Sequence, residues 1–131
     1  MFAPAFDVEL VNVGYYNGHA DKLLSVQLVL IDRSDVAPGD FDMEFNHCKV
    51  QWEAGDVSGG SGGYWHGPDG EPARAGFAHP NGPSFEFSGS GVERGLLDVN
   101  QTTGLIWHSF NSTNSGRYFF EFRDGSPRQT P

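Results

Sequence analysis

Alternation of apolar and polar residues is the feature that most narrows what this chain can fold into. Residues 40–52 read DFDMEFNHCKVQW, with apolar side chains at 41, 43 and 45 and polar ones at 42, 44 and 46. A two-residue period sends the two sets to opposite faces of a β-strand. The phase then reverses, because residues 50 and 52 are apolar while 49 and 51 are polar. One extra residue swaps the faces, so we expect a β-bulge or hairpin between Asn46 and Lys49.

The same period recurs along the chain, and turn residues separate the alternating segments. Segment 23–32, LLSVQLVLID, is partly apolar on both faces, which favours a central strand. Segment 14–22 is expected to be a turn, and no helix of ten or more residues is expected. Besides 23–32 and 40–52, strands are predicted at 6–13, 74–78, 84–87, 95–99, 103–110 and 116–124. This pattern predicts an all-β fold, an antiparallel β-sandwich-like single domain with long Gly-rich loops over residues 1–125, followed by a linker or tail at 126–131.

Composition excludes several classes of function. The net charge of the 131 residues is −9 and the eight Lys and Arg are scattered, which argues against nucleic acid or an anionic membrane as a partner. The longest apolar run is too short to insert into a membrane. The N-terminal MFAPAFDVEL lacks the features of a signal peptide, so an exported form would be a mature fragment or an excised domain. Cys48 is the only cysteine and is expected to be a small buried hydrophobe.

The Gly-rich stretch QWEAGDVSGGSGG, residues 51–63, is suited in principle to a phosphate, a metal ion or a structural loop. A phosphate loop of the Walker type needs a Lys and a following helix, and neither is present. The spacing of glycines in 89–95, GSGVERG, also misses the dinucleotide fingerprint by one residue. Phosphate binding is therefore rejected.

Metal binding receives weak support. The five histidines show no pair at zinc-ligand spacing. Carboxylates that could donate oxygens to calcium lie close together in sequence, although no EF-hand pattern is present and solvated turn carboxylates are commoner. The weak calcium candidates are Asp32, Asp35, Asp40 and Asp42, and Glu53 and Asp56 are further carboxylates that could donate oxygens. We expect no cofactor, with calcium as the open alternative.

No catalytic constellation stands out. The G-x-S-x-G motif of serine hydrolases is missing, and a carboxylate pair such as Glu86 with Glu121 is expected by chance in an acidic β-domain. The chain is therefore predicted not to be an enzyme. Asn100 and Asn111 start glycosylation sequons, which matter only on a eukaryotic secretory route.

Exposed aromatic residues are candidates for recognition. Tyr64, Trp65 and His66 form a candidate interaction loop, because such rings stack on sugars or anchor protein contacts. The competing interpretation is that Trp65 folds back as a lid on the edge of the sandwich. A carbohydrate-binding module would use Tyr64, Trp65 and Trp107.

The ordered succession of several segments resembles the nidogen-like extracellular domain in its bacterial branch. These segments are VGYYNGHADKLLSVQLVLIDRSD, FDMEFNHCKVQWEAGDVSGGSGG, PARAGFA, SFEFSGSGVERGLLDVNQTTGL and GRYFFEFRDG, which together cover about residues 11–125. The resemblance implies that W-x-x-G-D-x-S-G-G is a structural loop, with matching positions Trp52, Gly55, Asp56, Ser58, Gly59 and Gly60. Glycine permits positive φ there, and the Asp and Ser can hold the turn by hydrogen bonds.

The resemblance also implies a function, because the family is associated with adhesion and extracellular assembly and has no established catalytic residues. We therefore expect an extracellular or cell-surface interaction module. Its expected partners are proteins of the extracellular matrix or surface, or further copies of itself, with glycans as the alternative. The segment YWHGPDGE, residues 64–71, departs from the plainer family pattern, so individual specificity is expected there.

Overall fold

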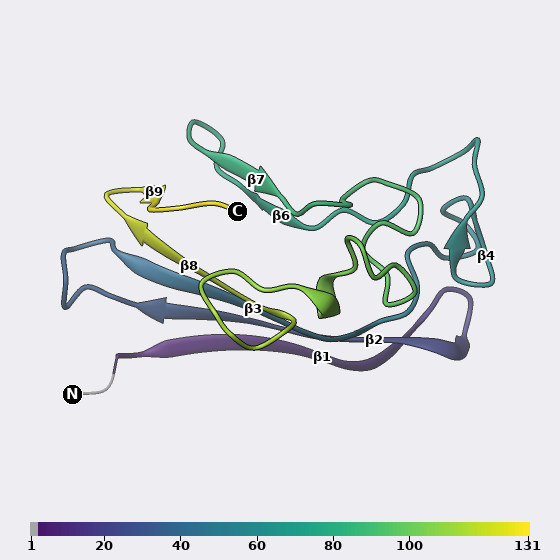
Figure 1. The fold of residues 1–131 in the computed structure, drawn as a ribbon, viewed down its shortest axis with the longest axis horizontal. Helices are drawn as coiled ribbons and strands as arrows, with labels where there is room; N and C mark the ends of the chain where they lie inside the picture. Colours follow the sequence, from purple (N-terminus) through teal and green to yellow (C-terminus); the bar gives the residue numbers. More distant parts are fainter. Residues whose placement is uncertain (1–2) are drawn as a thin grey trace.

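The structure, a computed structural model, describes residues 3–131, and within that range it contains strands and one short 3-10 helix but no α-helix (Figure 1). The predicted all-β class is therefore confirmed. The elements in chain order are β1 (Ala5–Tyr15), β2 (His19–Asp32), β3 (Phe41–Val50), β4 (Gly60–Ser61), β5 (Tyr64–Trp65), β6 (Gly76–Ala78), β7 (Ser84–Glu86), the 3-10 helix η1 (Leu105–Trp107), β8 (Arg117–Arg123) and β9 (Ser126–Pro127).

One antiparallel sheet forms the larger layer, with strand order β1-β2-β3-β8-β9. β2 pairs with β1 on one side and with β3 on the other, which confirms the prediction that segment 23–32 is a central strand. β1 lies at the margin of the sheet and runs along the border of the molecule (Figure 1). The hairpins β4–β5 and β6–β7 are separate from this sheet.

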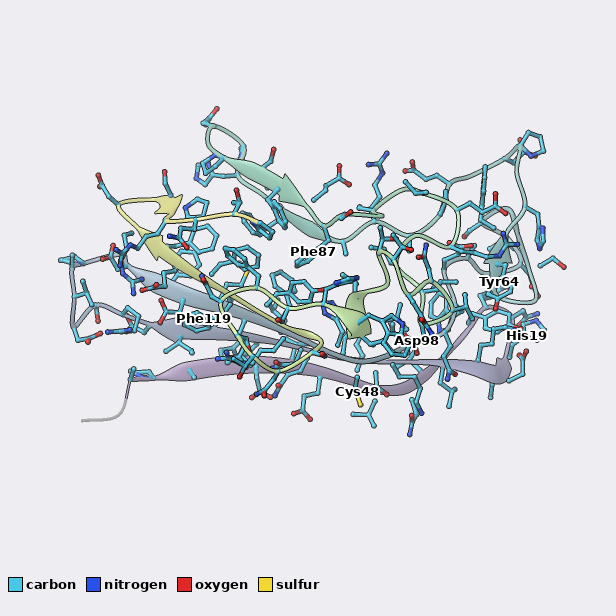
Figure 2. All side chains as sticks on the ribbon, viewed as in Figure 1. His19, Cys48, Tyr64, Phe87, Asp98 and Phe119 are labelled. Atoms are coloured by element: carbon cyan, nitrogen blue, oxygen red, sulfur yellow. The ribbon has the colours of Figure 1, made fainter. Side chains whose placement is uncertain are left out.

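The predicted bulge in the third strand is confirmed. Val26 pairs with His47 and Ser25 pairs with Lys49, so Cys48 is the additional residue. Cys48 is exposed on the outside of the sheet, which corrects the expectation that it is buried (Figure 2). The physical reason is alternation, since His47 faces the core and Cys48 continues the outward series of residues 42, 44 and 46, on the face that the second layer does not cover.

Aromatic rings fill the space between the two layers. Phe120 of β8 is fully buried, and its ring meets Phe45 and Phe77 edge to face at centroid distances of 6.0 and 5.1 Å. Such edge-to-face contacts are the favourable arrangement for aromatic pairs. The second layer, which consists of β6–β7 and the chain that follows it, covers this face of β3 and β8. The buried members of this core are Phe87, Leu96, Leu105, Tyr118, Phe120 and Phe122.

The opposite face of the large sheet is polar and cross-linked between strands. Arg117 donates to Glu44 at 2.6 Å, and the Asn46 amide donates to Gln27 at 2.9 Å. Pairs of this kind link β2, β3 and β8 on the solvent side. The two faces of the sheet therefore follow the alternation in the sequence.

Three predicted segments differ from the structure. The turn expected over 14–22 is confined to residues 16–18, because β1 and β2 both continue into it. Residues 95–99 are turns and 103–110 contain η1, so the two strands predicted there are wrong. The leucines of 95–99 are nevertheless buried. The main-chain groups of this region form hydrogen bonds within their own turns, and one example is Gly104 N–H, which donates to Asn100 O at 2.7 Å. Apolar content alone did not distinguish a buried loop from a strand.

The sheet also extends past the expected boundary at residue 125. Asp124 and Gly125 have φ values of 52° and 77°, which form the tight two-residue turn typical of an Asp-Gly hairpin. β9 then pairs with β8, with Ser126 opposite Arg123 and Pro127 opposite Phe122.

Candidate functional site

The loop that matches the family motif docks onto the turn between β1 and β2. The indole N–H of Trp52 donates to Val13 O at 2.9 Å, and the Asp56 N–H donates to Tyr16 O at 2.7 Å. Within the loop, the N–H groups of Ser58 and Gly60 both donate to Gly55 O. The motif thus closes one end of the molecule by joining two segments about 40 residues apart in sequence.

Glycine is required in this loop by close approach of main chains. A Cβ on Gly60 would lie 2.7 Å from the carbonyl oxygens of Ala54 and Gly55. Gly59 has a φ of 79°, and a Cβ there would collide with Asp69 O. Any side chain at these two positions would therefore displace the neighbouring main chain.

Asp56 links the motif loop to the first hairpin. Its Oδ2 lies 2.7 Å from His19 Nε2 and also accepts from the main-chain N–H of Asn17 at 3.3 Å. The hydrogen bond from His19 is the main cause that holds the pKa of the Asp56 carboxyl below its usual range. Figure 2 shows His19 at the same end of the molecule as Tyr64. Ser58 is exposed and contributes through its main-chain N–H.

A second polar contact secures the same turn. The buried Tyr15 donates to Asp21 Oδ1 at 2.7 Å, and its ring stacks on His19 at a centroid distance of 4.6 Å. The hydrogen bond to Asp21 raises the pKa of Tyr15 to about 12 and lowers that of Asp21. A phenol held in its protonated form serves here as a structural donor.

Glu53 is a structural residue whose role sequence reasoning missed. Its carboxylate is buried and accepts from the main-chain N–H groups of Trp65 at 3.1 Å and Arg94 at 2.7 Å. These bonds connect the motif loop to β5 and to the turn at Arg94. The only feature of the sequence that pointed to this buried role was the position of a charged residue between the apolar Trp52 and Ala54.

The candidate interaction loop is folded onto the domain. Tyr64 has the Lys22 ammonium 5.0 Å and the Arg94 guanidinium 4.8 Å from its ring centroid. Trp65 is half-buried, and its indole N–H donates to Asp69 O at 3.0 Å. His66 is exposed. A sugar that stacked on Tyr64 would compete with these cations, so the recognition role of the loop stays a prediction.

The acidic residues proposed for calcium are engaged by other groups. Asp42 is buried between Arg33 at 3.2 Å and Arg123 at 2.9 Å. Asp35 also pairs with Arg33, and hydrogen bonds from that guanidinium lower the pKa of Asp35.

The other two candidates bind main-chain groups. Asp40 accepts from Asp124 N–H and Asp32 from Ser34 N–H. In residues 3–131, no three His, Cys, Asp or Glu side chains form a group able to hold a metal ion.

The remaining candidates are dispersed. Glu86 lies on β7, bound by Arg74 and Ser90, while Glu121 lies on β8, bound by Arg123, so the two carboxylates do not form a pair.

The side-chain amides of the two sequon residues form hydrogen bonds with nearby main-chain groups. Asn100 Oδ1 accepts from Thr102 and Thr103 N–H, and Asn111 Nδ2 donates to Phe119 O.

The comparisons with known proteins identify a family and nothing closer. The family model of the nidogen-like domain matches residues 4–124. No curated protein and no solved structure matches the chain. The part of the chain that the structure describes holds no helix of the length and apolar character needed to cross a membrane.

Proposed function

The chain belongs to the nidogen-like domain family, and we propose that it is a non-catalytic interaction module that takes part in adhesion or in the assembly of a surface structure. The family consists of extracellular modules without enzymatic activity. An extracellular or cell-surface location for this chain follows from the same proposal.

One observation carries the proposal. The second layer covers the β3–β8 half of the apolar sheet face but leaves the half nearest the margin open, so Phe6, Val8 and Leu10 are 64, 45 and 42% exposed. Contiguous apolar surface of this kind on a soluble domain marks an interaction site. The polar side chains near the motif are in contrast committed to holding the fold together, as the pairing of Asp56 with His19 illustrates.

Bead adhesion tests the proposal. Beads coated with the domain are washed over a panel of immobilised matrix and cell-surface proteins, over beads carrying the same domain, and over bovine serum albumin as the control surface. We expect retention on at least one protein surface above the albumin level. Equal retention on every surface would contradict the proposal.

Carbohydrate binding is the second candidate, because Trp107 presents a 45% exposed indole on η1. A glycan panel monitored by Trp fluorescence tests it, with Trp107→Ala and Trp65→Ala as the paired variants. A saturable response that Trp107→Ala removes would favour this candidate over protein adhesion. Release of reducing ends from any glycan would contradict the non-catalytic assignment.

A further inference from the structure

The free edge of β1 combines an unpaired main chain with an open apolar face. β1 pairs only with β2 in the described part of the chain, so its other side ends the sheet. Pro4 O accepts from Asp32 N–H at 2.8 Å, which places residues 4, 6, 8 and 10 in the hydrogen-bonded positions toward β2. In an antiparallel ladder the alternate residues then direct their N–H and C=O groups outward. These residues are Ala5, Asp7 and Glu9.

A groove of about 490 Å³ lies beside this edge, between the uncovered sheet face and the second layer. Val8 and Leu10 of β1 and Leu28 of β2 form its floor, while Ala75 and Leu96 lie on the side of the second layer. Its lining is mostly apolar. An added strand would extend the row of Phe6, Val8 and Leu10 and shield this surface from water.

Charge on the other face of the edge indicates what kind of strand fits. Asp7 and Glu9 point to the outer face, where Gln27 Nε2 donates to both, at 3.4 and 2.9 Å. Among the residues that the structure describes, neither carboxylate has a cationic partner within 4 Å. A neighbouring strand with Lys or Arg at these positions would form cross-strand ion pairs.

The same charges disfavour a second copy as the occupant of this edge. In the registers of fullest overlap, two antiparallel β1 strands that match their apolar faces place Asp7 opposite itself or opposite Glu9. Like charges directly across a ladder are destabilising, and both copies carry a net charge of −9. Charged residues on an edge are a known protection against unselective pairing. Here they leave an oppositely charged strand as the fitting partner.

We propose that β1 accepts an extended segment of another protein, about six residues long, in which apolar residues alternate with Lys or Arg. The length follows from the regular part of β1, because the register with β2 is unbroken from Ala5 to Leu10 and shifts before Val13. Main-chain hydrogen bonds supply affinity and the alternating side chains supply selectivity. This inference rests on the proposed function and specifies the surface through which it operates.

Peptide binding tests this inference. The probe is a fluorescein-labelled octapeptide, Lys-Val-Arg-Val-Lys-Ile-Arg-Val, and its controls are the same composition in two blocks and a version with Glu at every basic position. Fluorescence anisotropy at low salt is expected to detect binding of the alternating basic peptide alone. Equal binding of the basic and glutamate versions, or no binding of either, would overturn the proposal.

A charge reversal of the domain provides the matched test. The double variant Asp7→Lys/Glu9→Lys is expected to bind the basic peptide at least about tenfold more weakly and to acquire binding of the glutamate peptide. The control Asp69→Lys/Glu93→Lys changes the same net charge at exposed positions away from β1 and is expected to behave as the parent domain. Equal weakening by both variants would overturn the proposal, because it would show a response to net charge alone.

The bead assay separates this inference from the proposed function. Adhesion that survives Asp7→Lys/Glu9→Lys, together with a failed peptide test, removes β1 as the docking edge and leaves the adhesive function standing. Light scattering provides a third check, since a dimer of the parent domain that the double variant abolishes would contradict the assignment to a basic partner.

Discussion

Asp56 on the motif loop and His19 at the start of β2 are joined by a 2.7 Å contact between Oδ2 and Nε2, across 37 positions of the chain. The contact fastens the Gly-rich loop to the first hairpin. The contact therefore gives the Asp of the motif a structural role.

Replacing Asp56 with Ala is expected to lower the midpoint of thermal unfolding without altering any binding, because the loop loses its contacts with His19 and Asn17. The lowered pKa of Asp56 adds a pH signature. Its stabilising contribution is complete above the ordinary carboxyl range and is lost as the pH falls through the lower pKa of the folded state. Thermal melts of this variant, with exposed Asp69→Ala as the control, check the prediction. Identical melting of Asp56→Ala and the parent would contradict it.

Glu53→Ala is expected to destabilise more strongly, because it leaves the partly buried N–H groups of Trp65 and Arg94 without their acceptor. An unsatisfied buried group costs about 1–3 kcal/mol. Glu53→Gln retains one acceptor oxygen and should fall between the parent and Glu53→Ala. Urea unfolding measures the series. A Glu53→Ala variant as stable as the parent would contradict the prediction.

His47 is expected to make the domain sensitive to acid. Burial among aromatic rings lowers its pKa from the usual 6.5 to about 4. The unfolded chain therefore binds a proton that the folded chain rejects, and the folded state loses stability as the pH falls from 6.5 to 4. The loss amounts to about 3 kcal/mol, at 1.36 kcal/mol per pKa unit. The variant His47→Phe removes this titration, so its urea-derived stability should change less over that interval; an unchanged slope would contradict the assignment.

Substitution of two neighbouring phenylalanines of β8 should lower the stability of the domain by very different amounts. Phe120 is fully buried between the layers, and Phe120→Ala is expected to cost about 3–5 kcal/mol. Phe119 lies on the outer face against Arg117, and Phe119→Ala should cost much less. Urea unfolding of both variants checks the orientation of the strand. Similar losses would mean that both faces of β8 are covered.

Alternation predicted the long strands and the irregularity between Asn46 and Lys49, because β3 and β8 each have one face in the core and one face toward solvent. It failed at 95–99, where Leu97 is fully buried in a turn, since burial there comes from loop packing without a ladder. The Asp-Gly pair at 124–125 was a readable hairpin signal that would have predicted β9.

Only part of the candidate site could be predicted from the sequence. The close approaches at Gly60 follow from the glycine pattern, but the partners of Asp56 and Glu53 depend on segments far away in sequence. The open groove beside β1 was not visible at all, because alternation predicts an apolar face and says nothing about how much of it a second layer covers.

Amide hydrogen exchange at the β1 edge tests the central claim most directly. The N–H groups of Ala5, Asp7 and Glu9 are directed outward and should exchange rapidly in the free domain. With saturating alternating basic peptide, we predict that exchange at these three positions slows markedly, while exchange in the β6–β7 hairpin stays unchanged. Unaltered exchange at Ala5, Asp7 and Glu9 under saturation would contradict the claim that this module recruits its partner as an added strand.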